Sequence, residues 1–205
     1  MKRIAASVAI VAIVILAAVV RAGEKSAALA PQAPEKHVAF VNVGDAAPKD
    51  VFEAAVREAC QQFNIHVKTR AAAAPKAAEL TGVPEKLAAQ LAPDAILSVF
   101  VLNDERACGF LSAPGSWAMV NLRSLKQDKP SPEVYAQRVT KMLMKGLAHA
   151  AGAGATLEPR CVMYVGSFSL AGIDATSATY GPNAFFPISE TLRRLGGESL
   201  FVSPP

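Results

Sequence analysis

The segment Ala95–Leu102, with the sequence AILSVFVL, is a continuous apolar run of strand length. Successive side chains of a strand point to opposite faces of its sheet, so a strand with one wet face alternates between apolar and polar residues. This run does not alternate, which indicates a strand that is buried on both faces. Such strands occur in α/β folds, in which helices cover both sides of the sheet.

The order of the other elements agrees with an α/β fold. Short apolar or alternating runs predict further strands at Val38–Val43, Ile65–Thr69, Gly109–Ser112 and Trp117–Leu122. Apolar residues at helical spacing predict helices at Asp50–Phe63, Pro84–Leu91 and Pro132–Ala151, with a last one near Ser189–Leu195. The expected fold is a single domain over residues 38–205, with a mixed twisted sheet, a long helix and a C-terminal part that is irregular or helical.

The N-terminus has the pattern of a secretory leader. Lys2 and Arg3 precede Ile4–Val20, a run of 17 residues without charge, and small residues before Gly23 fit a cleavage site. Residues 1–22 are therefore predicted to be a signal peptide, or an N-terminal membrane anchor, because a run of this length is at the short limit for spanning a bilayer. Both alternatives predict an exported protein, which is periplasmic or extracellular or is anchored to the membrane by this segment. An Ala/Pro-rich linker is expected at residues 23–37.

The charge of the chain is nearly balanced once the leader is set aside. The chain contains 21 Lys and Arg against 17 Asp and Glu, and without Lys2, Arg3 and Arg21 it keeps 18 basic residues. These are scattered along the sequence and form no run. The composition therefore gives no support for binding to nucleic acid or to an anionic membrane surface. Contact with a membrane is expected only through the N-terminal segment.

The chain has three cysteines, Cys60, Cys108 and Cys161, so at most one disulfide can form within it. Sequence does not set the distances between them, and both pairing and burial as free thiols stay open. Burial is favoured, because unpaired cysteines pack as small apolar residues.

The most distinctive segment is Lys141–Met163, KMLMKGLAHAAGAGATLEPRCVM. It resembles the metzincin signature H-E-x-x-H-x-x-G-x-x-H, which is followed by a turn that carries a methionine. The signature positions are occupied here, in order, by Lys145, Gly146, His149, Gly152 and Ala155. Met163 falls at the methionine of the turn.

The flanking residues narrow this resemblance to the archaemetzincin family of zinc proteases. Arg138 and Lys141 match the R-x-x-K lead-in to the family's active-site motif, and Pro159–Met163 is similar to the end of the family's longer pattern. The family has a second, structural zinc held by four Cys. Only Cys161 matches one of these ligands, and the later Cys-x-x-Cys falls near Tyr180–Ala184, which contains no Cys. The resemblance implies a metzincin-like domain whose long helix is of the active-site type.

The residues at the motif positions predict that catalytic zinc is lost. Such a zinc needs three protein ligands and an open position for water, and His149 alone remains. A charged Lys145 has no lone pair to offer, and Gly146 has no carboxylate to act as general base. We therefore expect no catalytic residue and no cofactor, with His149 and Cys161 as vestigial ligands and Met163 as a packing residue. Cys161 paired with His149 as nucleophile and base is a minor alternative.

Lys145 and His149 lie one helical turn apart and are expected to face the same hollow. The ammonium of Lys145 would then lie where the charge of the zinc would be, and it could hold a carboxylate or a peptide carbonyl.

The predicted function is that of an exported, inactive archaemetzincin-like pseudoprotease that binds a peptide or a protein. The expected partner is an extended peptide that adds as a strand to the edge of the sheet, or a protein of the cell envelope. Three alternatives stay open. The chain could be a zinc-dependent metallopeptidase with ligands from other positions, in which case zinc is the cofactor. It could also be a structural interaction domain of the envelope. The motif could also be a chance match within an ordinary amphipathic helix over Glu133–Ala151.

Overall fold

The structure is a computed structural model that describes residues 36–63, 65–73, 83–105, 109–167 and 169–196. The expected leader at 1–22, nearly all of the expected linker and Cys108 lie outside these ranges. The described residues all belong to one compact unit that begins at Lys36. No helix within the described ranges combines the length and the apolar composition that a membrane crossing requires.

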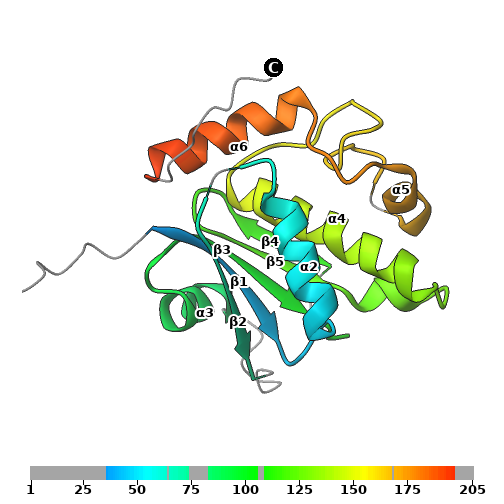
Figure 1. Ribbon diagram of the computed structural model, residues 1–205, viewed down its shortest axis with the longest axis horizontal. Helices are drawn as coiled ribbons and strands as arrows, with labels where there is room; N and C mark the ends of the chain where they lie inside the picture. The colour runs from blue at the N-terminus through cyan, green and yellow to red at the C-terminus, as the bar shows by residue number, and fades with distance from the viewer. Residues whose placement is uncertain (1–35, 64, 74–82, 106–108, 168, 197–205) are drawn as a thin grey trace, which may run out of the picture. The chain divides into compact units, whose positions relative to one another are not determined.

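Five strands form one mixed sheet (Figure 1). They are β1 (His37–Val43), β2 (Val67–Ala72), β3 (Ala95–Leu102), β4 (Phe110–Ala113) and β5 (Trp117–Asn121), in the spatial order β2-β1-β3-β5-β4. The pairs β1–β2, β1–β3 and β3–β5 are parallel, and β4 is antiparallel to β5 at one edge. The predicted α/β fold with a mixed sheet and the buried strand Ala95–Leu102 are confirmed. β1 begins at His37, which is buried, one residue before the predicted strand.

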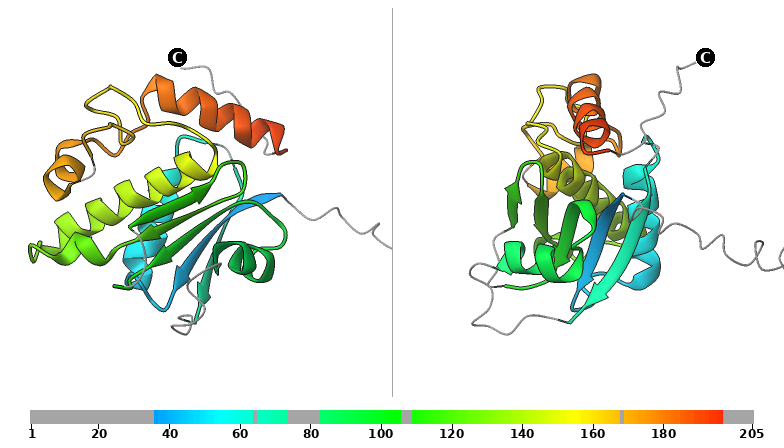
Figure 2. Two further views of the ribbon diagram at one scale, coloured as in Figure 1. Left: turned by 180° about the vertical axis from the view of Figure 1, so that it is seen from behind. Right: turned by 90° about the vertical axis from the view of Figure 1, so that its left-hand side faces the viewer.

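Helices cover the two faces of this sheet. On one face lie α2 (Lys49–Cys60) and the long α4 (Pro132–Ala150), and on the other lies α3 (Val83–Leu91) (Figure 2). The alternation of strand side chains divides β3 between the faces, because Val99 and Val101 pack with the α2/α4 cluster and Phe100 and Leu102 with the α3 cluster. A strand of this kind has no wet face, which explains its continuous apolar sequence.

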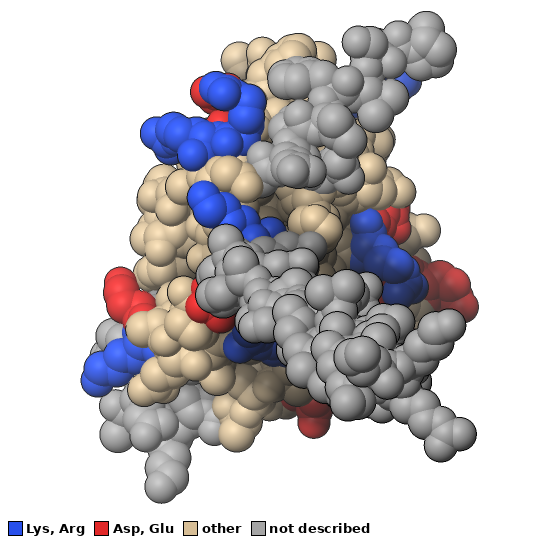
Figure 3. Space-filling view, turned by 60° about the vertical axis from the view of Figure 1, so that its left-hand side comes forward, with Lys and Arg blue, Asp and Glu red and all other residues tan. Residues whose placement is uncertain are grey.

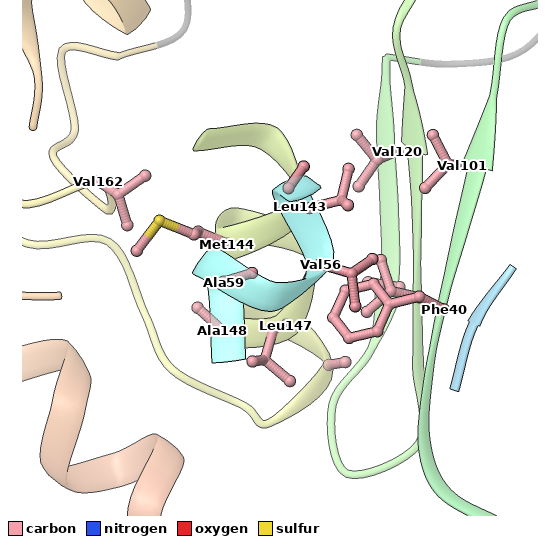
Figure 4. Close-up of a cluster of buried hydrophobic side chains, with 14 of the residues drawn as sticks. Phe40, Val56, Ala59, Val101, Val120, Leu143, Met144, Leu147, Ala148 and Val162 are labelled. Atoms are coloured by element: carbon pink, nitrogen blue, oxygen red, sulfur yellow. The ribbon is translucent and has the colours of Figure 1, made fainter. Parts of the chain in front are cut away.

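The helix α4 is covered on the side away from the sheet as well. Figure 4 shows Leu143 on the side of Val120 in the sheet, and Met144 on the opposite side, toward Val162 of the chain that follows the helix. Twelve of the nineteen residues of α4 are buried. The covering segment contains two more helices, α5 (Leu170–Ala175) and α6 (Pro182–Arg194).

Element boundaries differ from the sequence predictions at several places. The helix predicted to end at Phe63 ends at Cys60, and the second strand begins at Val67 and not at Ile65. The last helix is far longer than Ser189–Leu195, because α6 begins at Pro182 and continues through Pro187. Proline is well tolerated in the first turn of a helix, where its missing N–H would have no helical partner. Pro187 lies inside the helix, beyond its first turn.

Candidate functional site

The long helix begins and ends on specific capping interactions. The Ser131 hydroxyl accepts a hydrogen bond from the N–H of Val134 at the N-terminus, where Pro132 is the first helical residue. At the other end Gly152 has φ +86°, and its N–H bonds to His149 O while that of Ala153 bonds to Ala148 O. This pattern is a Schellman motif, which requires a left-handed residue and so favours glycine. Gly152 therefore ends the helix and turns the chain back toward it.

The returning chain completes a cavity of about 340 Å³ beside the helix. Four of the predicted positions line it: Lys145 and His149 on the helix, Ala155 just after the turn, and Met163 on the next segment. The other described lining residues come from β4 and the residue before it, from β5 and the short 3-10 helix after it (Arg123–Lys126), from α4 and from the covering segment. They are Gly109, Phe110, Asn121, Ser124, Met142, Tyr164, Ser167 and Ile173. Positions 18 residues apart in the sequence thus meet in one hollow, as the resemblance implies.

Lys145 is fixed at the wall of this cavity by the segment that covers the helix. Its Nζ donates hydrogen bonds to Ser167 O at 2.5 Å and to Ser167 Oγ at 2.6 Å. The residue is 8% exposed. Burial, and secondarily the positive charge of Lys141, lower the pKa of Lys145 to about 8. The ammonium therefore remains the main form at neutral pH, at an energetic cost that its surroundings impose.

His149 lies one turn after Lys145 and packs its ring against Phe110 of β4. The two ring centroids are 4.6 Å apart, with the planes tilted by 55°. Burial, and then the charge of Lys145, lower the pKa of His149 below its ordinary value. The imidazole is therefore neutral at physiological pH and combines an apolar contact with one hydrogen-bond donor and one acceptor.

Gly146 does not face the cavity. A Cβ at this position would lie 2.7 Å from Val99 Cγ1 and 3.0 Å from Val120 Cγ2. Both valines belong to the face of the sheet on which α4 packs. The missing side chain lets the helix approach the sheet closely, and a Glu at this position would require the helix or the strands to move.

The residues at the motif positions do not fit a catalytic zinc. A lone pair for the metal is available only on His149, because the Lys145 ammonium is a donor and Ala155 has no polar atom. Within the described ranges, no group of three or more His, Cys, Asp or Glu side chains could hold a metal ion.

Two further cations continue the row that Lys145 belongs to. Arg138, Lys141 and Lys145 are spaced by three and four residues, which places them along one side of α4. The Arg138 guanidinium bonds to both carboxylate oxygens of Asp128 and of Asp174 and to Leu125 O, over distances of 2.6–2.9 Å. Lys141 Nζ donates to Ile173 O and Asp174 O. Arg138 and Lys141 were predicted only to be part of a lead-in pattern, although their helical spacing with Lys145 indicates a shared face.

Cys161 lies in a different place from the cavity. Its Sγ accepts hydrogen bonds from the N–H of Met163 at 3.3 Å and of Gly181 at 3.2 Å. The segment Tyr180–Ala184, where the resemblance places the later Cys-x-x-Cys, therefore contacts Cys161 through Gly181. Cys161 is not among the described residues that line the cavity, so the structure gives no support to its pairing with His149. Cys60 and Cys161 are both buried free thiols.

The fold is similar to those of solved zinc-peptidase structures. The archaemetzincin from Methanopyrus kandleri superposes with a TM-score of 0.63 at 20% sequence identity, over 81% of this chain and 100% of that one. A zinc-dependent peptidase from Methanocorpusculum labreanum gives a TM-score of 0.57 at 15% identity, over 74% and 99% of the two chains. No protein-family model matches this sequence, and no curated protein matches it either. These similarities show an archaemetzincin-like fold.

Proposed function

From the archaemetzincin-like fold as premise, we propose that this chain is a pseudoprotease, which binds an extended peptide in the former active-site cleft without zinc and without hydrolysis. The observation that carries the proposal is the position of Lys145. Lys145 stands at the sequence position of the family's first zinc ligand, its ammonium is fixed by Ser167, and it lines the cavity together with His149. A buried cation there opposes a dication, because like charges repel strongly in a medium of low dielectric constant.

Hydrolysis through a zinc-bound water also needs a general base. The position of the family's Glu is taken by Gly146, whose missing Cβ points at Val99 and Val120 of the sheet. A side chain at this position would start against the sheet, and the glycine supplies no general base to the cavity. We infer that the cavity, the helix and the turn serve to bind a peptide.

The edge strand β4 supports the mode of binding. It is the last strand in the sheet order, and Phe110 belongs both to this strand and to the cavity wall. Hydrogen-bonded positions alternate along an antiparallel pair. Because Asn121 N donates to Gly109 O, Leu111 also bonds toward β5, and Phe110 and Ser112 present their N–H and C=O groups outward. A peptide can add to these groups as a further strand.

Other classes of partner receive less support. Among the described residues visible in Figure 3, Lys/Arg and Asp/Glu side chains are interspersed among other residues and form no continuous basic patch. A nucleic-acid ligand requires such a patch. The basic start and apolar run of residues 1–22 remain the basis for export, and we expect the mature protein to begin near Gly23. N-terminal sequencing of the secreted or envelope-bound protein tests this, and a full-length soluble cytoplasmic product contradicts it.

The first experiment measures metal. The purified chain is dialysed against a weak chelator and its zinc is determined by elemental analysis, with peptide cleavage assayed in the presence of added zinc. We expect no stoichiometric zinc and no cleavage. About one zinc per chain would overturn the proposal and favour a metallopeptidase with ligands from other positions.

The second experiment tests binding along β4. A pool of random hexapeptides is passed over the immobilised protein, retained peptides are identified by mass spectrometry, and their affinities are measured. Ser112→Pro removes an outward N–H without breaking a bond to β5 and should reduce retention strongly. Ser112→Ala keeps the N–H and should bind as the unchanged protein does. Equal retention by the Pro and Ala variants would exclude strand addition at this edge.

A further inference from the structure

The cavity beside Lys145 combines apolar walls with positive charge. The walls are built largely from Phe110, Met142, Met163 and Ile173, and the ionisable side chains among the described lining residues are Lys145, His149 and Tyr164. No Asp or Glu is among them. A ligand that fills this space must therefore bring its own apolar group and can bring a negative charge.

The electrostatic surroundings of Lys145 favour an anionic ligand. Burial and the neighbouring Lys141 both disfavour the charged form and lower the pKa of Lys145. Lys141 has its own pKa lowered, by burial first, with the charge of Arg138 as a further cause against the opposing effect of Asp174. A negative charge placed in the cavity would relieve this repulsion, because an opposite charge nearby stabilises the ammonium.

The ammonium is also pre-organised. Its two bonds to Ser167 fix Nζ at the wall of the cavity, so a ligand does not have to order a long, flexible side chain when it binds. Pre-organisation of this kind raises affinity by reducing the entropy lost in binding.

We propose that this cavity takes the C-terminal carboxylate of a peptide whose last side chain is apolar, with Lys145 as the carboxylate-binding residue. The inference rests on the proposed function and specifies its ligand. Phe110 joins the edge strand to the cavity wall, so a peptide added along β4 can end in the cavity. A volume of about 340 Å³ is at the lower end of the range for ligand pockets and suits the end of a chain. A phosphate would instead call for a cluster of Arg.

The test compares one peptide in two forms. A hexapeptide from the retained pool that ends in Leu is prepared with a free C-terminal carboxylate and as the C-terminal amide. We expect the acid to bind at least tenfold more tightly, which corresponds to about 1.4 kcal/mol. In Lys145→Met the two forms should bind equally. Lys49→Met, which removes an exposed Lys at the start of α2, is the matched control and should keep the preference.

A second variant keeps the test valid if Lys145→Met does not fold. Ala155 is exposed at the rim of the cavity, so Ala155→Leu should fill part of the space while leaving Lys145 and Ser167 in place. We expect it to abolish the preference for the acid and to weaken the binding of both forms, because both place the same apolar side chain in the cavity.

The outcomes separate the two proposals. Equal binding of acid and amide to the unchanged protein, with retention still lost in Ser112→Pro, overturns the carboxylate site and keeps peptide binding. A preference for the acid that survives in folded Lys145→Met or in Ala155→Leu overturns the assignment to this cavity. Absence of binding by either form overturns the proposed function itself.

Discussion

Arg138 and Lys145 are buried cations on the same side of α4, but the charges of their described hydrogen-bond partners differ. Arg138 makes five hydrogen bonds, four of them to the carboxylates of Asp128 and Asp174. These bonds hold the pKa values of both carboxyls below their usual range. The bonds from Lys145 to Ser167 go to two uncharged oxygens, and a cavity lies beside it.

The different partners indicate different roles for these two cations of α4. A guanidinium between two carboxylates is saturated, and its geometry fastens α4 to the chain before it and to the end of α5. An ammonium that is desolvated and faces a cavity is destabilised in its charged form and is a candidate for binding. We therefore expect the first cation to maintain the scaffold and, if the proposed function holds, the second to select the ligand of the cavity.

The largest expected effect is the loss of stability when Arg138 is replaced. Arg138→Met should destabilise the protein by about 3 kcal/mol, because it leaves two carboxylates and Leu125 O without their charged partner. Asp128 and Asp174 keep side-chain exposures of 47% and 41%, so water can reach them and limits the cost. Urea denaturation measures the change.

Arg193→Met is the matched control for Arg138→Met. Arg193 pairs with Glu190 on the surface of α6, with side-chain exposures of 57% and 61%. Exposed pairs contribute little, and no measurable change is expected. If the two Arg variants were equally stable, the bonds of Arg138 would not be a structural fastening.

The next largest effect is expected from an engineered zinc site in the cavity. Lys145→His together with Ala155→His, with His149 unchanged, supplies three ligands around the cavity and should create a zinc site. Gly146 is kept, because a side chain there meets the sheet. At a free zinc concentration of about 100 times the dissociation constant, binding should stabilise the variant by about 2.7 kcal/mol. Thermal denaturation with and without zinc measures this, and Lys145→His alone should respond less. A folded double variant that ignores zinc would show that the turn after Gly152 has diverged.

A smaller effect is expected from the helix face that rests on the sheet. Gly146→Ala places a methyl group 2.7 Å from Val99 Cγ1 and should cost about 1 kcal/mol, since overpacking outweighs the better helix propensity of Ala. Gly154→Ala, with nothing within 4 Å of its Cβ, is the control and should be neutral. Adding Val99→Ala should remove the clash, so the two substitutions should cost less together than the sum of their separate effects. Strict additivity would mean that the helix has room to shift.

Local sequence patterns predicted individual strands and helices and the spacing of the motif residues. The apolar run Ala95–Leu102 identified a strand buried on both faces, and the motif spacing placed Lys145, His149, Ala155 and Met163, which the structure brings into one cavity. The contacts that distinguish the two cations join distant positions. Asp174 is 36 residues from Arg138, and Ser167 is 22 residues from Lys145. Such pairs follow from the packing of the covering segment on α4, which has no local signature. Only the end of α6 was predicted, near Ser189–Leu195, although this helix begins at Pro182.

The smallest expected effect at neutral pH belongs to Lys145→Met, and its pH dependence is the most specific test of the comparison. Replacement of a buried charge by an apolar side chain of similar length is often neutral, and Ser167 Oγ keeps its bond to Tyr164 O. We therefore expect a change of less than about 1 kcal/mol at pH 7. Any larger loss at this pH would mean that the bonds to Ser167 stabilise the fold as those of Arg138 do.

The sign of the pH effect follows from the lowered pKa. Lys145 releases its proton near pH 8 in the folded chain, and near pH 10.4 when unfolded. Between these values the unfolded state binds the additional proton, so rising pH stabilises the folded protein. The protein should gain stability over Lys145→Met from about pH 8 to pH 10. Lys141, Asp174, Arg138 and Tyr164 are present in both proteins, so their titration largely cancels, and His149 titrates below this window. Urea denaturation at pH 7, 8, 9 and 10 measures the difference. A difference that does not change with pH would mean that Lys145 titrates as an exposed lysine, which would remove the contrast with Arg138.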